Sequence, residues 1–217
     1  MRKHMNVLAV LGVLALVPVA ASAATFGGEV YGAFNTHTMC DWNDVIDDAN
    51  SSGGEFDNVS SDLTGGLDLR MWATPNWMFS AGWEPLFLNT EDASTDTKLT
   101  LDANAFTFTG AYYFPSSSKA RYGLGAGLGY YVSGGSIESP SSPTVDIDGS
   151  GVGFHFLGLG EWTVSPGFSI TAASGYRVAK LSSTELTDGT TTVDSPYDSD
   201  YSGFMGRVGL AFYMPTK

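Results

Sequence analysis

Aromatic residues that recur at a fixed spacing constrain this chain most. Six alternating segments carry a pair eight residues apart, and a seventh carries Trp77 and Trp83. Eight residues of a strand cover about 26 Å, or about 20 Å once the strand tilts by about 40°. Two aromatic girdles around an apolar band are typical of a lipid-facing sheet, and a soluble sandwich has no physical reason for this spacing. The predicted girdle residues are Phe26, Phe34, Trp77, Trp83, Phe106, Phe114, Tyr122, Tyr130, Phe154, Trp162, Phe168, Tyr176, Phe204 and Phe212.

Period-two alternation continues through most of the chain after residue 25. The candidate strands are 26–38, 63–73, 77–86, 104–114, 121–133, 151–164, 168–180 and 202–214. Three short connections contain turn residues, and the four long ones are 39–62, 87–103, 134–150 and 181–201. Long loops without periodicity are uncommon in compact soluble domains. Short turns on one side and long loops on the other are the construction of outer-membrane barrels.

The face opposite the aromatic pairs is polar. Its charged residues and one histidine form a predicted interior polar network of Glu29, Asp68, Arg70, Glu84, His155, Glu161, Arg177 and Arg207. Of 23 acidic residues, 19 lie in the long connections or their margins, and the other four belong to this network. A soluble barrel would place its apolar face inside. The sequence therefore predicts an all-β, eight-stranded antiparallel up-and-down transmembrane β-barrel with four long extracellular loops and three short periplasmic turns.

The first 23 residues have the layout of a signal peptide. Arg2 and Lys3 precede an apolar run over 7–20, and Ala21-Ser22-Ala23 forms a cleavage site. The run is shorter than the roughly 20 residues that span a bilayer as a helix. We expect 1–23 to direct export and 24–217 to form the barrel domain in the outer membrane. The net charge of −13 excludes nucleic-acid binding through neutralised phosphates.

Three segments resemble a known superfamily. Thr74-Pro-Asn-Trp77 with Trp83, the Tyr122-Gly-Leu-Gly-Ala-Gly-Leu-Gly-Tyr130 run, and the stretch 161–177 are similar to small outer-membrane barrels of the OmpA/OmpX/OmpW type. The resemblance implies periplasmic termini, outer-membrane lipids as partners and a monomer. Barrels of this type usually end on an aromatic residue, whereas here the segment 214–217 follows the last aromatic pair. We expect none of the peptidoglycan-binding domain that longer OmpA relatives carry.

The interior of the predicted barrel suggests a plug. Reflecting the second hairpin about its turn brings Asp68 beside Glu84, with Arg70 between them as a shared cation. This cluster is either a structural plug or a gate. The inward glycines at 123, 125, 127 and 129 leave volume that we expect Arg177 or Arg207 to occupy. Other bulky residues on the inward face are Trp72, Met78, Tyr131, Leu157 and Tyr213.

The remaining candidates for chemistry are weak. A metal site needs three or four ligands, and neither His37 nor His155 has suitable neighbours in sequence, so we expect no metal and no cofactor. Neither histidine matches the His-x-Ser pair of membrane-embedded lipid A deacylases. The stretch 146–149 carries only part of a calcium-loop pattern. In the most acidic loop, 42–49 has helical spacing with Asp41 as a possible cap; a solvated loop without helix is the alternative.

These observations favour a structural or surface-interaction barrel without catalysis. The alternative is a narrow porin-like conduit for small solutes or apolar molecules, which the OmpW resemblance implies. A lipid-modifying enzyme is a third hypothesis, but it lacks a nucleophile–base pair. The acidic loops make divalent cations candidate partners, and loops of this composition carry whatever recognition the protein has.

Overall fold

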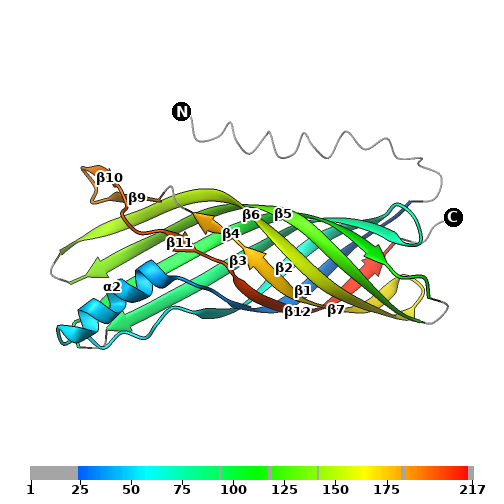
Figure 1. Cartoon of the computed structure of the whole chain (residues 1–217), viewed down its shortest axis with the longest axis horizontal. Helices are drawn as coiled ribbons and strands as arrows, with labels where there is room; N and C mark the ends of the chain where they lie inside the picture. Colours follow the sequence, from blue (N-terminus) through cyan, green and yellow to red (C-terminus); the bar gives the residue numbers. More distant parts are fainter. Residues whose placement is uncertain (1–23, 93, 117–118, 141, 182–183, 215–217) are drawn as a thin grey trace.

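Eight antiparallel strands close into a barrel in the computed structural model, which describes residues 24–92, 94–116, 119–140, 142–181 and 184–214. The predicted eight-stranded barrel is therefore confirmed. The ring strands are β1 (Thr25–Thr36), β2 (Ser61–Trp72), β3 (Trp77–Asp92), β4 (Thr97–Tyr113), β5 (Ala120–Ser139), β6 (Ser142–Ser165), β7 (Phe168–Val178) and β12 (Gly203–Tyr213). The ring closes where β1 pairs with β12 (Figure 1). The predicted signal peptide and residues 215–217 lie outside the described residues.

The strand register fixes the tilt and the width of the barrel. A row of paired residues that starts at Thr25 passes once through every strand and returns to β1 at Asn35, ten residues further along. Ten residues of about 3.3 Å across eight strands about 4.8 Å apart give a tilt of about 40° and a backbone diameter of about 16 Å. An interior of this width is filled by side chains.

The aromatic pairs all lie on the outside of the barrel. Twelve of the fourteen are exposed, while Tyr130 and Phe168 are half-buried. The register aligns members of one girdle on adjacent strands, as Phe106 pairs with both Trp83 and Tyr130. We call the part of the barrel between the two girdles the membrane segment. Its outer face carries apolar side chains and glycines almost throughout, as a bilayer requires.

Four strands continue well beyond the membrane segment. The stretches 87–103 and 134–150, predicted as loops, are instead the extended ends of the hairpins β3–β4 and β5–β6. The prediction was wrong because the polarity of the two faces reverses there. Leu88 and Leu101 point inward and are buried, whereas Asn89 and Lys98 point outward. A search for an oily outer face therefore ends the strands too early.

The fourth long connection also contains strands. It contains β8 (Lys180–Leu181), β9 (Thr184–Thr187), β10 (Thr192–Asp194) and β11 (Ser199–Asp200). β9 pairs with the extended part of β6, and β11 pairs with β8. Figure 1 shows these strands and α2 toward the same end of the barrel. The chain thus builds a second layer of structure outside the membrane.

The predicted helix in the first loop is present as α2 (Cys40–Ser51). Its N-cap is Met39 in a left-handed conformation (φ 37°), and no side chain caps the helix. The prediction that Asp41 caps this helix is wrong, because its carboxylate accepts a hydrogen bond from the backbone N–H of Asp198 at 2.9 Å. Within the described residues, no helix is long and apolar enough to cross a membrane.

Helix α2 closes over the extracellular end of the barrel. Its Trp42 and Ile46 are buried against inward-facing side chains of the extended hairpins. We call this group the mouth cluster: Met39, Trp42, Ile46, Val59, Leu86, Leu88, Leu99, Leu101, Ala103, Ala105, Tyr131, Ile147, Ala179, Leu181 and Tyr201. The mouth is therefore packed like the core of a soluble domain.

Candidate functional site

The lumen of the membrane segment holds a network of charged side chains. All eight residues of the predicted interior network lie inside the barrel, and seven of them are at most 4% exposed, while Arg207 is partly buried. Arg121 joins them from the start of β5. The network contains four arginines and four carboxylates, so their formal charges cancel. Buried charges persist only when they are paired in this way.

The periplasmic end of the network centres on Arg70. Its guanidinium lies 3.6 Å from a Glu29 oxygen and 3.4 Å from a Glu161 oxygen, and it donates a hydrogen bond to the Tyr113 hydroxyl. Arg121 binds the other Glu161 oxygen at 2.7 Å. Its guanidinium also stacks 4.0 Å above the ring of Trp72. These contacts lie inside the periplasmic end of the lumen.

The middle of the network is the pair of Arg207 and Asp68. Their closest charged atoms are 3.2 Å apart. The Arg207 guanidinium also lies 4.6 Å from the centre of the Tyr31 ring, a cation–π contact. Tyr31 then donates a hydrogen bond to Glu84 at 3.2 Å. Tyr31 therefore connects the middle of the network to its extracellular end.

The extracellular end centres on Glu84. Arg177 and Asn35 both donate hydrogen bonds to its Oε1, at 3.1 and 2.9 Å. Arg177 is 2% exposed and lies 5.7 Å from the centre of the Tyr131 ring, which belongs to the mouth cluster. The charged network and the mouth cluster are thus in direct contact across the lumen.

The predicted bridge of Arg70 between Asp68 and Glu84 is wrong. Asp68 pairs in register with Gly82, and Glu84 lies one inward position closer to the extracellular end. Because neighbouring strands are staggered, Glu84 faces Arg177 on the opposite wall and Asp68 faces Arg207. Reflecting one hairpin predicts neighbours on adjacent strands, whereas Glu84 pairs across the lumen and Asp68 pairs with Arg207 two strands away.

The space beside the inward glycines is filled by residues other than the predicted arginines. A Cβ atom at Gly127 would clash with the His155 imidazole, and one at Gly129 would lie 2.7 Å from the Tyr131 ring. His155 also contacts the Thr109 hydroxyl at 2.8 Å and pairs in register with Arg177. The glycines therefore make room for bulky neighbours on the adjacent strands.

A second histidine lies at the edge of the mouth cluster. His37 Nε2 is 3.3 Å from an Asp62 oxygen, and the His37 ring makes an edge contact with Tyr201. Burial raises the pKa of the Tyr201 phenol well above its ordinary value, and its hydroxyl donates to the Asp102 carbonyl.

On the outer surface, the Asp198 carboxylate raises the pKa of Lys180 by hydrogen bonding and by its charge.

No metal site is evident in the part of the chain that the structure describes, where no three His, Cys, Asp or Glu side chains converge suitably. The stretch 146–149 is part of β6, so the partial calcium-loop pattern is in fact a strand.

Two hollows of about 580 and 250 Å³ both lie on the outer wall of the barrel.

Sequence reasoning missed several residues of the network, among them Tyr113, whose hydroxyl accepts a hydrogen bond from Arg70. Arg121, Tyr31 and Thr171 all contact its carboxylates, and the Thr171 hydroxyl donates to Glu29. Arg121 has the inward parity of the glycines that follow it, so alternation could have identified it. Tyr31 and Thr171 carry no charge, and alternation alone gives no reason to select them.

Comparisons with known proteins identify the fold. No family model and no curated protein matches the sequence. Three solved structures match over 88% of this chain: a major outer membrane protein of Thermus thermophilus (TM-score 0.60, 12% identity, all of that chain), OprG of Pseudomonas aeruginosa (0.57, 12%, 95%) and Ail of Yersinia pestis with a heparin analogue (0.54, 10%, 99%). The chain has the fold of the small outer-membrane β-barrels. An outer-membrane location agrees with this fold and with the apolar outer face between the girdles.

Proposed function

We propose that this protein is a structural or surface-interaction barrel of the outer membrane, without catalysis and with a closed lumen. Two groups of contacts inside the lumen carry this proposal: Arg121, Glu161 and Arg70 at the periplasmic end, and Arg207, Tyr31 and Glu84 nearer the extracellular end. Above them, α2 and the mouth cluster cover the extracellular end. A barrel plugged by paired charges and capped by a packed core leaves its loops as the part that can meet partners.

The charge of the extracellular part indicates which partners fit. Nineteen acidic residues lie there, against only two described basic residues, Lys98 and Lys180. The crystal structure of Ail contains a heparin analogue, which is a polyanion. The opposite charge of the present loops favours cationic ligands, such as divalent cations or basic proteins.

The interior histidine does not suggest an enzyme. His155 and Thr109 form a hydrogen-bonded pair, as a base and a nucleophile would. Both are buried in the lumen, and the space beside His155 is occupied by the chain at Gly127. A substrate therefore has no room to approach the Thr109 hydroxyl.

Conductance in a planar bilayer tests the closed lumen. We expect the reconstituted wild-type protein to give no steady openings, because ion pairs and aromatic side chains fill an eight-stranded interior. Arg70→Met should raise the leak, and Lys98→Met, which removes the same charge from an exposed position, should not. Steady openings in the wild type would instead support the narrow conduit.

A binding measurement tests the proposed role of the loops. Protein in liposomes should bind polylysine and not heparin, and the binding should weaken as salt rises. Stronger binding of heparin would contradict the assignment of a cationic partner.

A further inference from the structure

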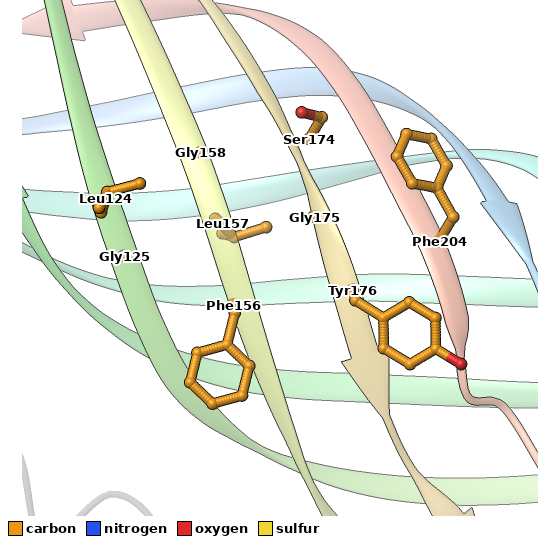
Figure 2. Close-up of a pocket in the computed structure, with 9 residues that line it drawn as sticks. All are labelled: Leu124, Gly125, Phe156, Leu157, Gly158, Ser174, Gly175, Tyr176 and Phe204. Carbon is orange, nitrogen blue, oxygen red and sulfur yellow. The ribbon is translucent and has the colours of Figure 1, made fainter.

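The larger hollow is on the outer wall of the membrane segment, between β5, β6, β7 and β12. It has a volume of about 580 Å³. Figure 2 shows Leu124 and Phe156 on one side of it and Tyr176 and Phe204 on the other. Gly158 lies between them, and without a side chain there the floor of the hollow is backbone. The result is an apolar recess in a surface that otherwise projects large side chains.

The hollow opens on the outer-leaflet side of the membrane segment. Tyr176 and Phe204 pair in register and belong to the girdle on the extracellular side. Leu124 lies one outward position from Tyr122, which belongs to the opposite girdle. The hollow thus begins at the extracellular girdle and runs past the middle of the membrane segment toward the opposite girdle. Because the whole outer face of the membrane segment is a lipid contact surface, the hollow is continuous with that interface.

A hydroxyl group distinguishes this hollow from the rest of the outer face. Ser174 is exposed at its edge, one outward position below Tyr176 and about 5 Å deeper along the barrel axis. Among the outward positions between the girdles of the described strands, Ser174 is the one polar side chain that is not aromatic. A hydroxyl facing hydrocarbon is costly unless it finds a partner. At this depth, the available partners are the ester and hydroxyl oxygens at the head of a lipid chain.

We infer that the hollow binds one acyl chain of an outer-leaflet glycolipid of the lipid A type. The chain lies over Gly158 between the aromatic side chains, and the Ser174 hydroxyl donates a hydrogen bond to the ester or hydroxyl oxygen nearest the sugar. The aromatic rims hold the chain by contact, and the serine sets its depth. This site is independent of the closed lumen and of the charge on the loops.

Native mass spectrometry of the full chain with added lipid A tests the site. The wild type should retain one lipid A molecule. Gly158→Leu should reduce retention at least about tenfold, because the new side chain occupies the floor of the recess. Gly110→Leu is the matched control on the outer face of β4. A Cβ atom at either glycine meets only ordinary contacts, 3.7 Å from Ser174 O at Gly158 and 3.5 Å from the Phe79 ring at Gly110.

Ser174→Ala provides a second variant that leaves the shape of the wall unchanged. Loss of one hydrogen bond should lower retention about fivefold. A shift in apparent mass between unheated and boiled samples in SDS would verify that each variant folds. Equal retention by Gly158→Leu and Gly110→Leu would overturn the site. A wild-type dimer that Gly158→Leu converts to a monomer would also overturn it, since a second copy would then be the occupant.

Discussion

The membrane segment and the extracellular part of this barrel share the same strands, but lipid surrounds one and water surrounds the other. In the membrane segment, β3 points Trp83 outward and Glu84 inward, so that lipid meets apolar side chains and the lumen holds charge. A few residues later, the same strand points Leu86 and Leu88 inward, and Asn89 outward. The backbone pairing with β4 continues without a register shift across this change.

The comparison shows that polarity, and not the backbone, marks the membrane boundary. The membrane segment is stabilised inside by ion pairs, whose geometry is demanding. The extracellular part is stabilised inside by the mouth cluster, which depends on apolar burial. One continuous sheet therefore contains two interiors of different physical kind. The same kind of substitution on the same face of a strand should therefore change stability by different amounts in the membrane segment and in the extracellular part.

The largest effect is expected from breaking the interior of the membrane segment. Arg70→Met leaves Glu29 without its nearest cation in a restricted lumen, and should lower the free energy of unfolding by about 3–5 kcal/mol. The urea midpoint in detergent micelles measures this change. Lys98→Met should shift the free energy by no more than about 0.5 kcal/mol. Coincident midpoints for Arg70→Met and wild type would refute the role of the network.

An intermediate effect is expected from a charge on the outer face. Leu124 and Ser136 both point outward from β5, but Leu124 lies between the girdles and Ser136 lies beyond them. Leu124→Arg should destabilise the barrel by about 1–3 kcal/mol, between the cost of a charge at the bilayer midplane and the smaller cost near the interface. Ser136→Arg should change stability by no more than about 0.5 kcal/mol. Similar losses in liposome unfolding would place the boundary elsewhere.

The smallest effect on the membrane segment is expected from the mouth cluster. Trp42 is 1% exposed, and Trp42→Ala removes the largest contact that α2 makes there. We expect a protease to cut within 40–60 in the variant, while the SDS mobility shift of the barrel stays unchanged. Asp44→Ala, on the same helix but not part of the cluster, is the control. A variant that resists the protease as the wild type does would show that α2 is held by other contacts.

The sequence predicted the fold because lipid imposes a strong pattern. Aromatic pairs and inward charges are visible one strand at a time, and no knowledge of neighbours is needed to find them. The partners of Arg70 were not predictable in this way, because they depend on the ten-residue stagger around the ring. The extended hairpins were missed for a different reason, since Leu99 and Ile147 lie on the face that is polar lower in the barrel. Polar and apolar residues still alternate there, but the apolar residues face inward and the polar residues face outward.

The reversal of polarity also affects how faithfully the strands can pair during assembly. A slip of β3 by one residue would turn Glu84 toward lipid, and the same slip would turn Leu88 toward water. Neither half could accept the error to relieve the other, because one unbroken strand crosses both. The correct register of each long hairpin is therefore favoured twice. A misaligned intermediate would be higher in free energy both within the membrane segment and outside it.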